Sequence, residues 1–374
     1  GAAFVCEISS TRSRAIMADM SRTASMGRMS QPVIKMPQDN SLVVGFLEHS
    51  PSHYGEEVTF ASILPPAFIC AIISMIWSIH FALHLQPLLQ MRLPHHMQNE
   101  DDLQRGWREL LISQTLVFLV LTCYARAVLT APGSVPNDNV WRLIDVERGL
   151  GACGTGSVIQ LPATQEVKVS GERRHCKWCL KYKPDRCHHC RVCKNCVLKM
   201  DHHCPWIMNC VGFGNHKYFY LLVVYTVTAC GFIAYTQSES VRRCSIEEMP
   251  SSKRFLLVLG MVFASIMATL MLAFLAFHTY LMLSGMTTIE FCEKNTARRP
   301  GIPSVARRGA NYDKGFFGNI RATLGPRPQF WLLPICPPDG DGMSFSIACP
   351  TKPSTLAGES KREGSCVGTR GSGA

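Results

Sequence analysis

The chain has 374 residues, of which 47% are hydrophobic and 17% are charged, whereas soluble proteins carry roughly 25% charged residues. This balance indicates a membrane protein rather than a string of soluble domains. The formal net charge of +11 is compatible with nucleic-acid binding, but it also arises when loops beside membrane spans collect Lys and Arg. The position of the basic residues therefore has to decide between the two classes.

The two ends of the chain are poor in apolar periodicity. Residues 1–60 form the predicted N-terminal tail. Its stretch from Gly1 to about Asn40 carries scattered Arg and Ser and lacks an apolar run followed by a small-residue cleavage site, so we expect no cleaved signal peptide. Residues 331–374 are rich in Gly, Ser, Pro and Thr. Because such compositions bury little apolar surface, we predict a largely disordered tail at each end, with the N-terminal tail in the cytosol.

Four stretches are long and apolar enough to cross a hydrocarbon layer of about 30 Å, which takes about 20 residues in a helix. They run approximately over 62–85, 110–130, 218–235 and 255–283. Each contains almost no charge, which disfavours the alternative of buried helices in a soluble core. We therefore predict an all-α integral membrane protein with four transmembrane helices, two within 61–130 and two within 217–285.

The basic residues predict the orientation in the membrane. The connection 131–216 holds many Lys and Arg side chains, which favours the cytosolic side, and an even number of spans then places both termini there as well. The third connection is the exception, since Arg242, Arg243, Lys253 and Arg254 would lie on the opposite side. We accept this mismatch because the long basic loop and the even span count outweigh it.

Eighteen cysteines are present, and many of them crowd between Cys176 and Cys210 at short spacings, interleaved with His. Pairs such as Cys176/Cys179 and Cys190/Cys193 have the spacing that lets a tight turn present two thiolates to one tetrahedral Zn²⁺. We therefore favour metal ligation in a reducing compartment over a disulfide framework. A structural site takes four ligands, so two sites would use eight side chains, and the spacing alone leaves their partition open.

Asp201, His202 and Cys204 bring three chemically complementary side chains within four residues, about a dozen residues before the third span. A Cys thiolate is a strong nucleophile, a neighbouring His takes up its proton, and an acid orients that His. A nucleophile at the membrane surface suits an enzyme that handles a lipid chain. The alternative is that the whole cluster is a structural zinc module.

The run Asp201-His202-His203-Cys204-Pro205-Trp206 within this cysteine-rich context resembles the Asp-His-His-Cys (DHHC) protein S-acyltransferase family. The spacing of Cys and His from Cys176 to Cys210 follows the pattern of that family throughout. The segment Thr287-Thr288-Ile289-Glu290 is similar to its Thr-Thr-x-Glu motif, and Asn311 to Asn319 resembles its C-terminal element. The resemblance covers about residues 60–325.

This resemblance implies a ligand set and a role for each catalytic side chain. One zinc would be held by Cys176, Cys179, His189 and Cys196, and the other by Cys190, Cys193, His203 and Cys210. His202 then remains as the proton acceptor, Asp201 as its orienting partner and Cys204 as the acylated nucleophile. A second run, Cys187-His188-His189-Cys190, has Arg186 where the acid would stand, so we expect no catalytic role for its first two residues.

The implied architecture is a cytosolic two-zinc domain, residues 131–216, between the second and third helices, followed after the fourth helix by a cytosolic element, residues 286–330, that carries the Thr-Thr-x-Glu motif. The implied activity is protein S-palmitoylation, a ping-pong transfer of an acyl group from palmitoyl-coenzyme A through acyl-Cys204 to cysteines of substrate proteins. Two structural Zn²⁺ ions, membrane-proximal substrate cysteines and the bilayer are the implied cofactors and partners, without nucleic acid. The membrane would be the Golgi, the endoplasmic reticulum or the plasma membrane.

Two other functions compete with this one. A non-enzymatic zinc-bearing membrane adaptor would use the same cluster only to bind proteins, and it predicts that Cys204 is dispensable. A membrane-bound ubiquitin ligase also uses Cys/His modules, but it would require neither the run beside a span nor the Thr287 to Glu290 element. One departure from the family is Ala131-Pro132-Gly133, where the family usually has Asp-Pro-Gly; we expect this loss of an acid to alter the turn locally rather than the chemistry.

Overall fold

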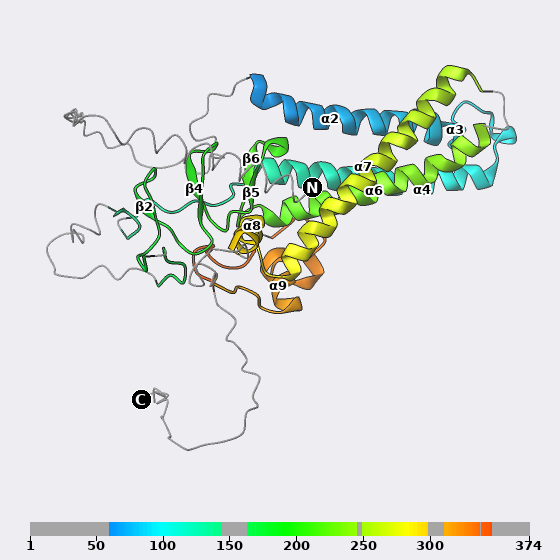
Figure 1. Cartoon of the computed structure of the whole chain (residues 1–374). Coiled ribbons are helices and arrows are strands. Elements are labelled where there is room, and N and C mark those ends of the chain that lie inside the picture. The colour runs from blue at the N-terminus through cyan, green and yellow to red at the C-terminus, as the bar shows by residue number, and fades with distance from the viewer. Residues whose placement is uncertain are drawn as a thin grey trace, which may run out of the picture.

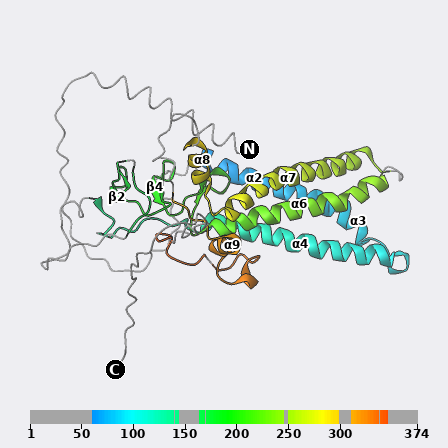
Figure 2. The same ribbon diagram turned by 60° about the horizontal axis from the view of Figure 1, so that its bottom comes forward.

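The computed structural model describes residues 60–138, 140–143, 163–168, 170–244, 249–297, 310–336 and 338–345. Long helices lie side by side, and short strands gather beyond one end of them (Figures 1 and 2). The tail predicted for residues 1–59 lies outside the described residues, as does most of the C-terminal tail. The described part of the C-terminal tail packs on the segment between the second and third long helices, since Met343 contacts the buried cluster that contains Val135 and Trp141.

In the part of the chain that the structure describes, four helices are long and apolar enough to cross a membrane, as predicted. The first is α2, Phe60–His80, which continues through the π-helical turn η1, Phe81–Leu85, into α3, Gln86–Leu88. The others are α4, Glu100–Leu129, α6, His216–Cys244, and α7, Ser251–Leu283. The chain is therefore a multi-pass membrane protein.

Helix α4 begins ten residues before the apolar stretch that predicts it, because its first turn has a strong cap. The side chain of Asn99 accepts hydrogen bonds from the backbone N–H groups of Asp101 and Asp102, at 3.0 and 3.2 Å. Acidic residues in that first turn also complement the positive end of the helix dipole. A hydropathy window misses this polar turn, although its capping signal is present in the sequence.

The bundle buries one set of apolar side chains and turns another outward. Ile76, Ile233 and Ala264 form a buried cluster between α2, α6 and α7, whereas Phe118 and Leu272 are 65% and 55% exposed. Contiguous apolar surface of this kind is unfavourable in water and favourable against lipid. The outward-facing side chains are therefore consistent with a bilayer around the four helices.

In the described residues between α4 and α6, the chain forms three small antiparallel hairpins. Strands β1, His175–Cys176, and β2, Lys181–Tyr182, form the first. Strands β3, His188–Cys190, and β4, Asn195–Val197, form the second, and β5, His202–Cys204, and β6, Asn209–Val211, form the third. Hairpins this short are marginal on their own, so bound metal is the expected source of their stability.

Two short helices close the junction between this module and the bundle: α8, Thr288–Ala297, and α9, Phe316–Leu324. Asn319 on α9 donates from Nδ2 to the carbonyl of Leu283 at the end of α7, at 2.7 Å. At the start of α6, the Lys217 ammonium donates to the carbonyls of Phe330 and Ile335, both at 2.8 Å. The C-terminal segment is thereby attached to both α6 and α7.

The turn at Ala131-Pro132-Gly133 is retained without the acid of the related family. Gly133 has a left-handed φ of +95°, which favours glycine. Its carbonyl accepts from the Leu198 N–H at 3.1 Å, and the carbonyl of Pro132 accepts from the Gly214 N–H at 3.0 Å. Backbone hydrogen bonds to the zinc module therefore hold this turn, which explains why alanine is compatible with the position.

Candidate active site and zinc clusters

The first Cys/His cluster contains Cys176, Cys179, His189 and Cys196, whose ligand atoms all lie within 4.8 Å of one another. The turn after β1 aims the Cys179 N–H at the Cys176 sulfur, at 3.4 Å. Across the second hairpin, His189 stands opposite Cys196 in the strand register. Local turn and strand pairing thus bring together the four side chains that the family resemblance groups.

The second cluster contains Cys190, Cys193, His203 and Cys210. Nδ1 of His203 lies 3.7, 3.4 and 3.6 Å from the sulfurs of Cys190, Cys193 and Cys210, and His203 pairs with Cys210 in the third hairpin. Because β3 supplies His189 to the first cluster and Cys190 to the second, the two clusters share a strand and are mechanically linked.

These distances fit tetrahedral zinc. Zn–S bonds of about 2.3 Å and Zn–N bonds of about 2.0 Å place ligand atoms roughly 3.5–3.8 Å apart at the corners of a tetrahedron. The Cys193 and Cys210 sulfurs are 3.5 Å apart, and Nδ1 of His189 lies 3.3 and 3.9 Å from the sulfurs of Cys179 and Cys196. The module therefore has two Cys₃His zinc-binding clusters.

Between the clusters and the bundle, the partly buried His202 pairs with the buried Asp201. Nδ1 of His202 lies 2.7 Å from Oδ2 of Asp201, which is 1% exposed. Since a carboxylate only accepts, Nδ1 carries the proton and Nε2 is left as the basic nitrogen. The arrangement has the base and orienting-acid geometry of a nucleophilic site.

The environment favours a positively charged His202. Burial by itself lowers the pKa of His202, but hydrogen bonds with Asp201 and Cys204 raise it to about 9. Burial likewise raises the pKa of Asp201, yet the hydrogen bond and charge of His202 outweigh it and leave the pKa below its usual range. An imidazolium formed by taking a proton from Cys204 is thus stabilised where it arises.

Thr288 holds Asp201 from the other side, 87 residues further along the chain. Its backbone N–H donates to Oδ1 of Asp201 and its hydroxyl donates to Oδ2, both at 2.8 Å. Asp201 therefore has both oxygens engaged, and its orientation toward His202 is fixed. Sequence reasoning recognised the Thr-Thr-x-Glu motif but gave none of its residues this role.

The same motif caps α8 and anchors it to the module. Glu290 accepts at Oε2 from the Thr287 N–H at 3.0 Å, and the Thr287 hydroxyl oxygen accepts from the Glu290 N–H at 3.3 Å, which is a capping box. Glu290 also accepts two hydrogen bonds from the Arg186 guanidinium, at 2.7 and 2.9 Å. The ion pair joins α8 to the zinc module and thereby keeps Thr288 beside Asp201.

Cys204 is 6% exposed and lies where the module meets the bundle. Its side chain lines an apolar cavity of about 480 Å³ whose wall is formed by α2, α4, α6 and α7. On α6 the lining runs from Phe219 to Ile233, about 21 Å at about 1.5 Å per residue. The nucleophile thus stands at one end of a long apolar space within the bundle.

Two aromatic rings pack against the ring of His202. Its ring lies edge-on to Phe219 with centroids 5.1 Å apart, and the centroid of the His278 ring of α7 is 5.8 Å away.

At the end of α4, the Asn209 amide donates to the carbonyls of Val128 and Thr130, both at 3.1 Å. Sequence reasoning noted Asn209 as a fit to the family without a role; here it satisfies orphan carbonyls of α4 beside the nucleophile.

The residues of the look-alike run have a different position. Cys187 is fully buried in a core cluster with Cys176, Cys196 and Leu198. Neither Cys187 nor His188 belongs to the two Cys₃His clusters among the described residues. We expect no catalytic role for these two side chains, and this stays a prediction.

Comparisons with known proteins match the same part of the chain. Residues 169–295 match the family described as DHHC palmitoyltransferase. Similar curated proteins are Palmitoyltransferase ZDHHC2 of Rattus norvegicus, 39% identical over 198 residues, Palmitoyltransferase ZDHHC15 of Homo sapiens, 41% over 180, and Palmitoyltransferase ZDHHC20-B of Danio rerio, 37% over 198. These alignments cover 51%, 48% and 52% of this chain and 52%, 51% and 57% of the relatives. The chain spans about half the length of the curated relatives it matches.

Proposed function

We propose, from the DHHC palmitoyltransferase domain that residues 169–295 form, that this chain is a protein-cysteine S-acyltransferase. The Cys204 thiol gives its proton to Nε2 of His202, and the sulfur attacks the thioester carbonyl of a long-chain acyl-coenzyme A. The carbon–sulfur bond to coenzyme A breaks, and its thiolate leaves with that proton. A cysteine thiol of a substrate protein then gives its proton to His202 and attacks the carbonyl of acyl-Cys204. The bond from that carbonyl to the Cys204 sulfur breaks, and this sulfur takes the proton back from His202.

The observation that carries the proposal is the position of Cys204. It lies beside His202, which is paired with Asp201, and also lines the apolar cavity between the helices. A nucleophile serving only water-soluble thioesters would need no such space. The combination of a base-activated thiol with a hydrophobic cavity suits an acyl-enzyme whose chain is held inside the bundle.

The length of the cavity suits a chain of about sixteen carbons. C–C bonds of about 1.5 Å meeting near the tetrahedral angle advance about 1.25 Å per carbon, so a palmitoyl chain spans roughly 19 Å. The cavity follows α6 for about 21 Å, and the buried cluster of Ile76, Ile233 and Ala264 lies at its far end. Palmitoyl is therefore the acyl group we propose.

The eight clustered side chains are proposed as the zinc ligands, Cys176, Cys179, His189 and Cys196 for one ion and Cys190, Cys193, His203 and Cys210 for the other. Four protein ligands complete a tetrahedron and leave no position for water, so each ion would be structural. Since His203 lies between His202 and Cys204, bound metal fixes the backbone on which the catalytic side chains stand.

The basic connection before α6 supports a zinc module that faces the cytosol, where acyl-coenzyme A is found. Because Cys204 stands near the start of a membrane helix, the substrate proteins would present cysteines close to the bilayer. An endomembrane of the Golgi or endoplasmic reticulum, or the plasma membrane, would house the enzyme.

The proposal is tested by trapping the acyl-enzyme. Purified, zinc-loaded protein is given labelled palmitoyl-coenzyme A, and thioester-linked label is followed by gel and mass spectrometry with and without hydroxylamine. We expect hydroxylamine-sensitive label on the wild type and none on Cys204→Ser. Equal label on both proteins, or no label on the folded wild type, would contradict the enzyme and favour the zinc-bearing adaptor.

A further inference from the structure

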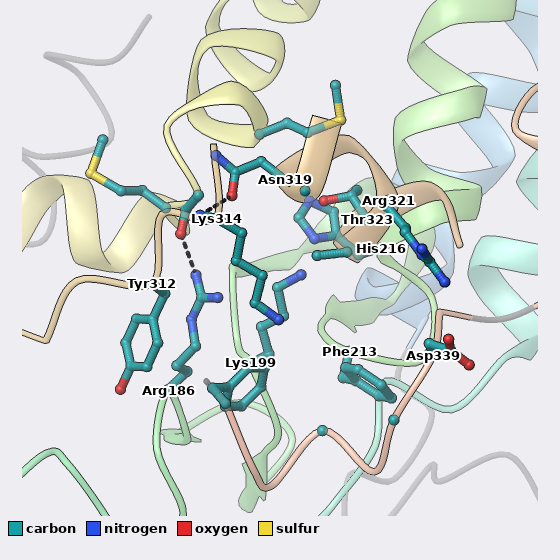
Figure 3. Close-up of a pocket in the computed structure, with 18 of the residues that line it drawn as sticks. Arg186, Lys199, Phe213, His216, Tyr312, Lys314, Asn319, Arg321, Thr323 and Asp339 are labelled. Atoms are coloured by element: carbon teal, nitrogen blue, oxygen red, sulfur yellow. Dashed lines mark hydrogen bonds between the residues drawn. The ribbon is translucent and has the colours of Figure 1, made fainter. Parts of the chain in front are cut away.

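A second cavity, of about 270 Å³, lies apart from the acyl cavity, between the zinc module, the end of α7 and the segment around α9 (Figure 3). The chemistry described above makes no use of it. Several basic side chains line it, whereas Asp339 is the one carboxylate among the described lining residues. The cavity therefore has a strong excess of positive charge.

Lys199 is the central cation of this cavity. It is 6% exposed, and Figure 3 shows its side chain extending into the cavity from the zinc module. Among the described residues, its ammonium has no hydrogen-bond or ion-pair partner. Burying an ammonium without a partner is costly, so such a group points to an anion that completes it.

The other cations converge on the same space from different elements. Lys314 precedes α9 and Arg321 lies on it; both side chains are exposed and line the cavity. Arg186 also lines it, but Glu290 already offsets its charge. Burial and the charges of Arg186 and Lys314 lower the pKa of Lys199 to about 7, against the attraction of Glu290 and Asp201. The positive charges of Arg186 and Lys314 therefore lie close enough to Lys199 to repel it.

His216 adds an unpaired donor or acceptor. This first residue of α6 is buried, its Nδ1 has no hydrogen-bond partner among the described residues, and its ring stands at the cavity. Asp201 is a buried carboxylate whose charge acts on His216, but both of its oxygens are occupied by His202 and Thr288. The described residues thus leave the Lys199 ammonium and Nδ1 of His216 without a hydrogen-bond partner.

We propose that this cavity is a binding site for a phosphate group, held by the ammonium groups of Lys199 and Lys314 and the guanidinium of Arg321, with His216 beneath. A phosphate has acceptor oxygens in several directions, which matches cations that approach from the module and from α9. It would also tie the C-terminal segment to the strand-bearing module two residues before Asp201.

Two sources carry this chemistry. The cavity lies where α6 begins and α7 ends, the level at which lipid headgroups stand, so an anionic phospholipid is one source. A soluble phosphate compound, including coenzyme A, is the other. The site does not rest on the proposed acyl transfer, because an anion bound here needs no reaction at Cys204.

The experiment measures binding to the purified, zinc-loaded full chain carrying Cys204→Ser, in a phosphate-free maltoside detergent. The probes are inorganic phosphate, coenzyme A and dihexanoyl phosphatidic acid, with dihexanoylglycerol as the phosphate-free lipid control. We expect saturable binding of at least one phosphate probe and at least tenfold weaker binding by Lys199→Met. Lys253→Met removes an exposed lysine at the opposite end of α7 and should bind like the parent protein.

The probe that binds most tightly identifies the source: phosphatidic acid indicates a lipid headgroup, coenzyme A the co-substrate, and inorganic phosphate a free anion. Without ligand, Lys199→Met should be at least as thermally stable as the parent, since it removes an unpaired buried charge. If it does not fold, Lys314→Met and Arg321→Met, both at exposed positions, should each weaken binding threefold or more. Absence of saturable binding by every probe, or unchanged binding in these variants, would overturn the site while leaving the acyl-enzyme assay unaffected.

Discussion

The link between Thr288 and Asp201 gives the sharpest test of how the site is positioned. Thr288→Val keeps the side-chain shape but removes the hydroxyl that donates to Oδ2 of Asp201 at 2.8 Å. The backbone N–H of Thr288 still donates to Oδ1. The substitution therefore deletes one of the two hydrogen bonds from Thr288 and leaves the fold of α8 and its capping box in place.

The expected size of the effect follows from the charge of the acceptor. A hydrogen bond to a charged group contributes about 1.5–3 kcal/mol. If the orientation of Asp201 serves His202 mainly while the imidazolium forms, that energy is lost from the transition state, and the rate of acyl-enzyme formation falls roughly 10- to 150-fold. Thr288→Ser, which keeps the hydroxyl, should recover most of the rate.

The assay is the single-turnover rate of label transfer from palmitoyl-coenzyme A to Cys204, measured at saturating acyl donor. Zinc content and thermal stability are measured on the same samples. A purely structural role predicts that the rate and the thermal stability fall together. A Thr288→Val protein with two zinc ions and a rate within twofold of wild type would refute the positioning of His202 through Thr288.

Three further outcomes follow from the structure. Ile233→Phe, at the end of the apolar cavity far from Cys204, should shift the preferred acyl chain by about two to four carbons toward shorter chains, measured by competition among acyl-coenzyme A donors. Ile266→Phe, an exposed position on α7, should leave the preference unchanged, and a shift in both variants would contradict the assignment. Glu290→Gln leaves the buried Arg186 guanidinium without its carboxylate partner and should lower the free energy of unfolding by about 3–5 kcal/mol. A loss below about 1 kcal/mol, measured by thermal or denaturant unfolding, would show that this ion pair is dispensable. Removing zinc with a chelator should abolish acyl-enzyme formation and unfold the hairpins, and Cys196→Ser should lower the zinc content measured by atomic absorption from two ions to one; retention of both ions would exclude Cys196 as a required ligand.

Much of the architecture was accessible from the sequence, because its signals are local. An apolar stretch must reach about 20 residues to cross a bilayer, and all four such stretches became long helices. Cysteines separated by two residues can share a turn, so pairs such as Cys176/Cys179 were recognisable as ligand pairs. The grouping of the eight ligands came from family resemblance, and only the hairpin registers explain it, since they set His189 against Cys196 and His203 against Cys210.

The sequence by itself therefore determined the number of membrane helices, the metal-binding character of the cysteine cluster and the identity of the Asp201-His202-Cys204 group. Tertiary structure alone decided what surrounds that group: Thr288 on the carboxylate, the ion pair of Arg186 with Glu290 across 104 residues, the apolar cavity behind Cys204, and the cationic cavity around Lys199. The physical reason is the range of the interaction. Turns, caps and hydrophobic period act over a few neighbouring residues, whereas these contacts join segments that approach only after the helices have packed.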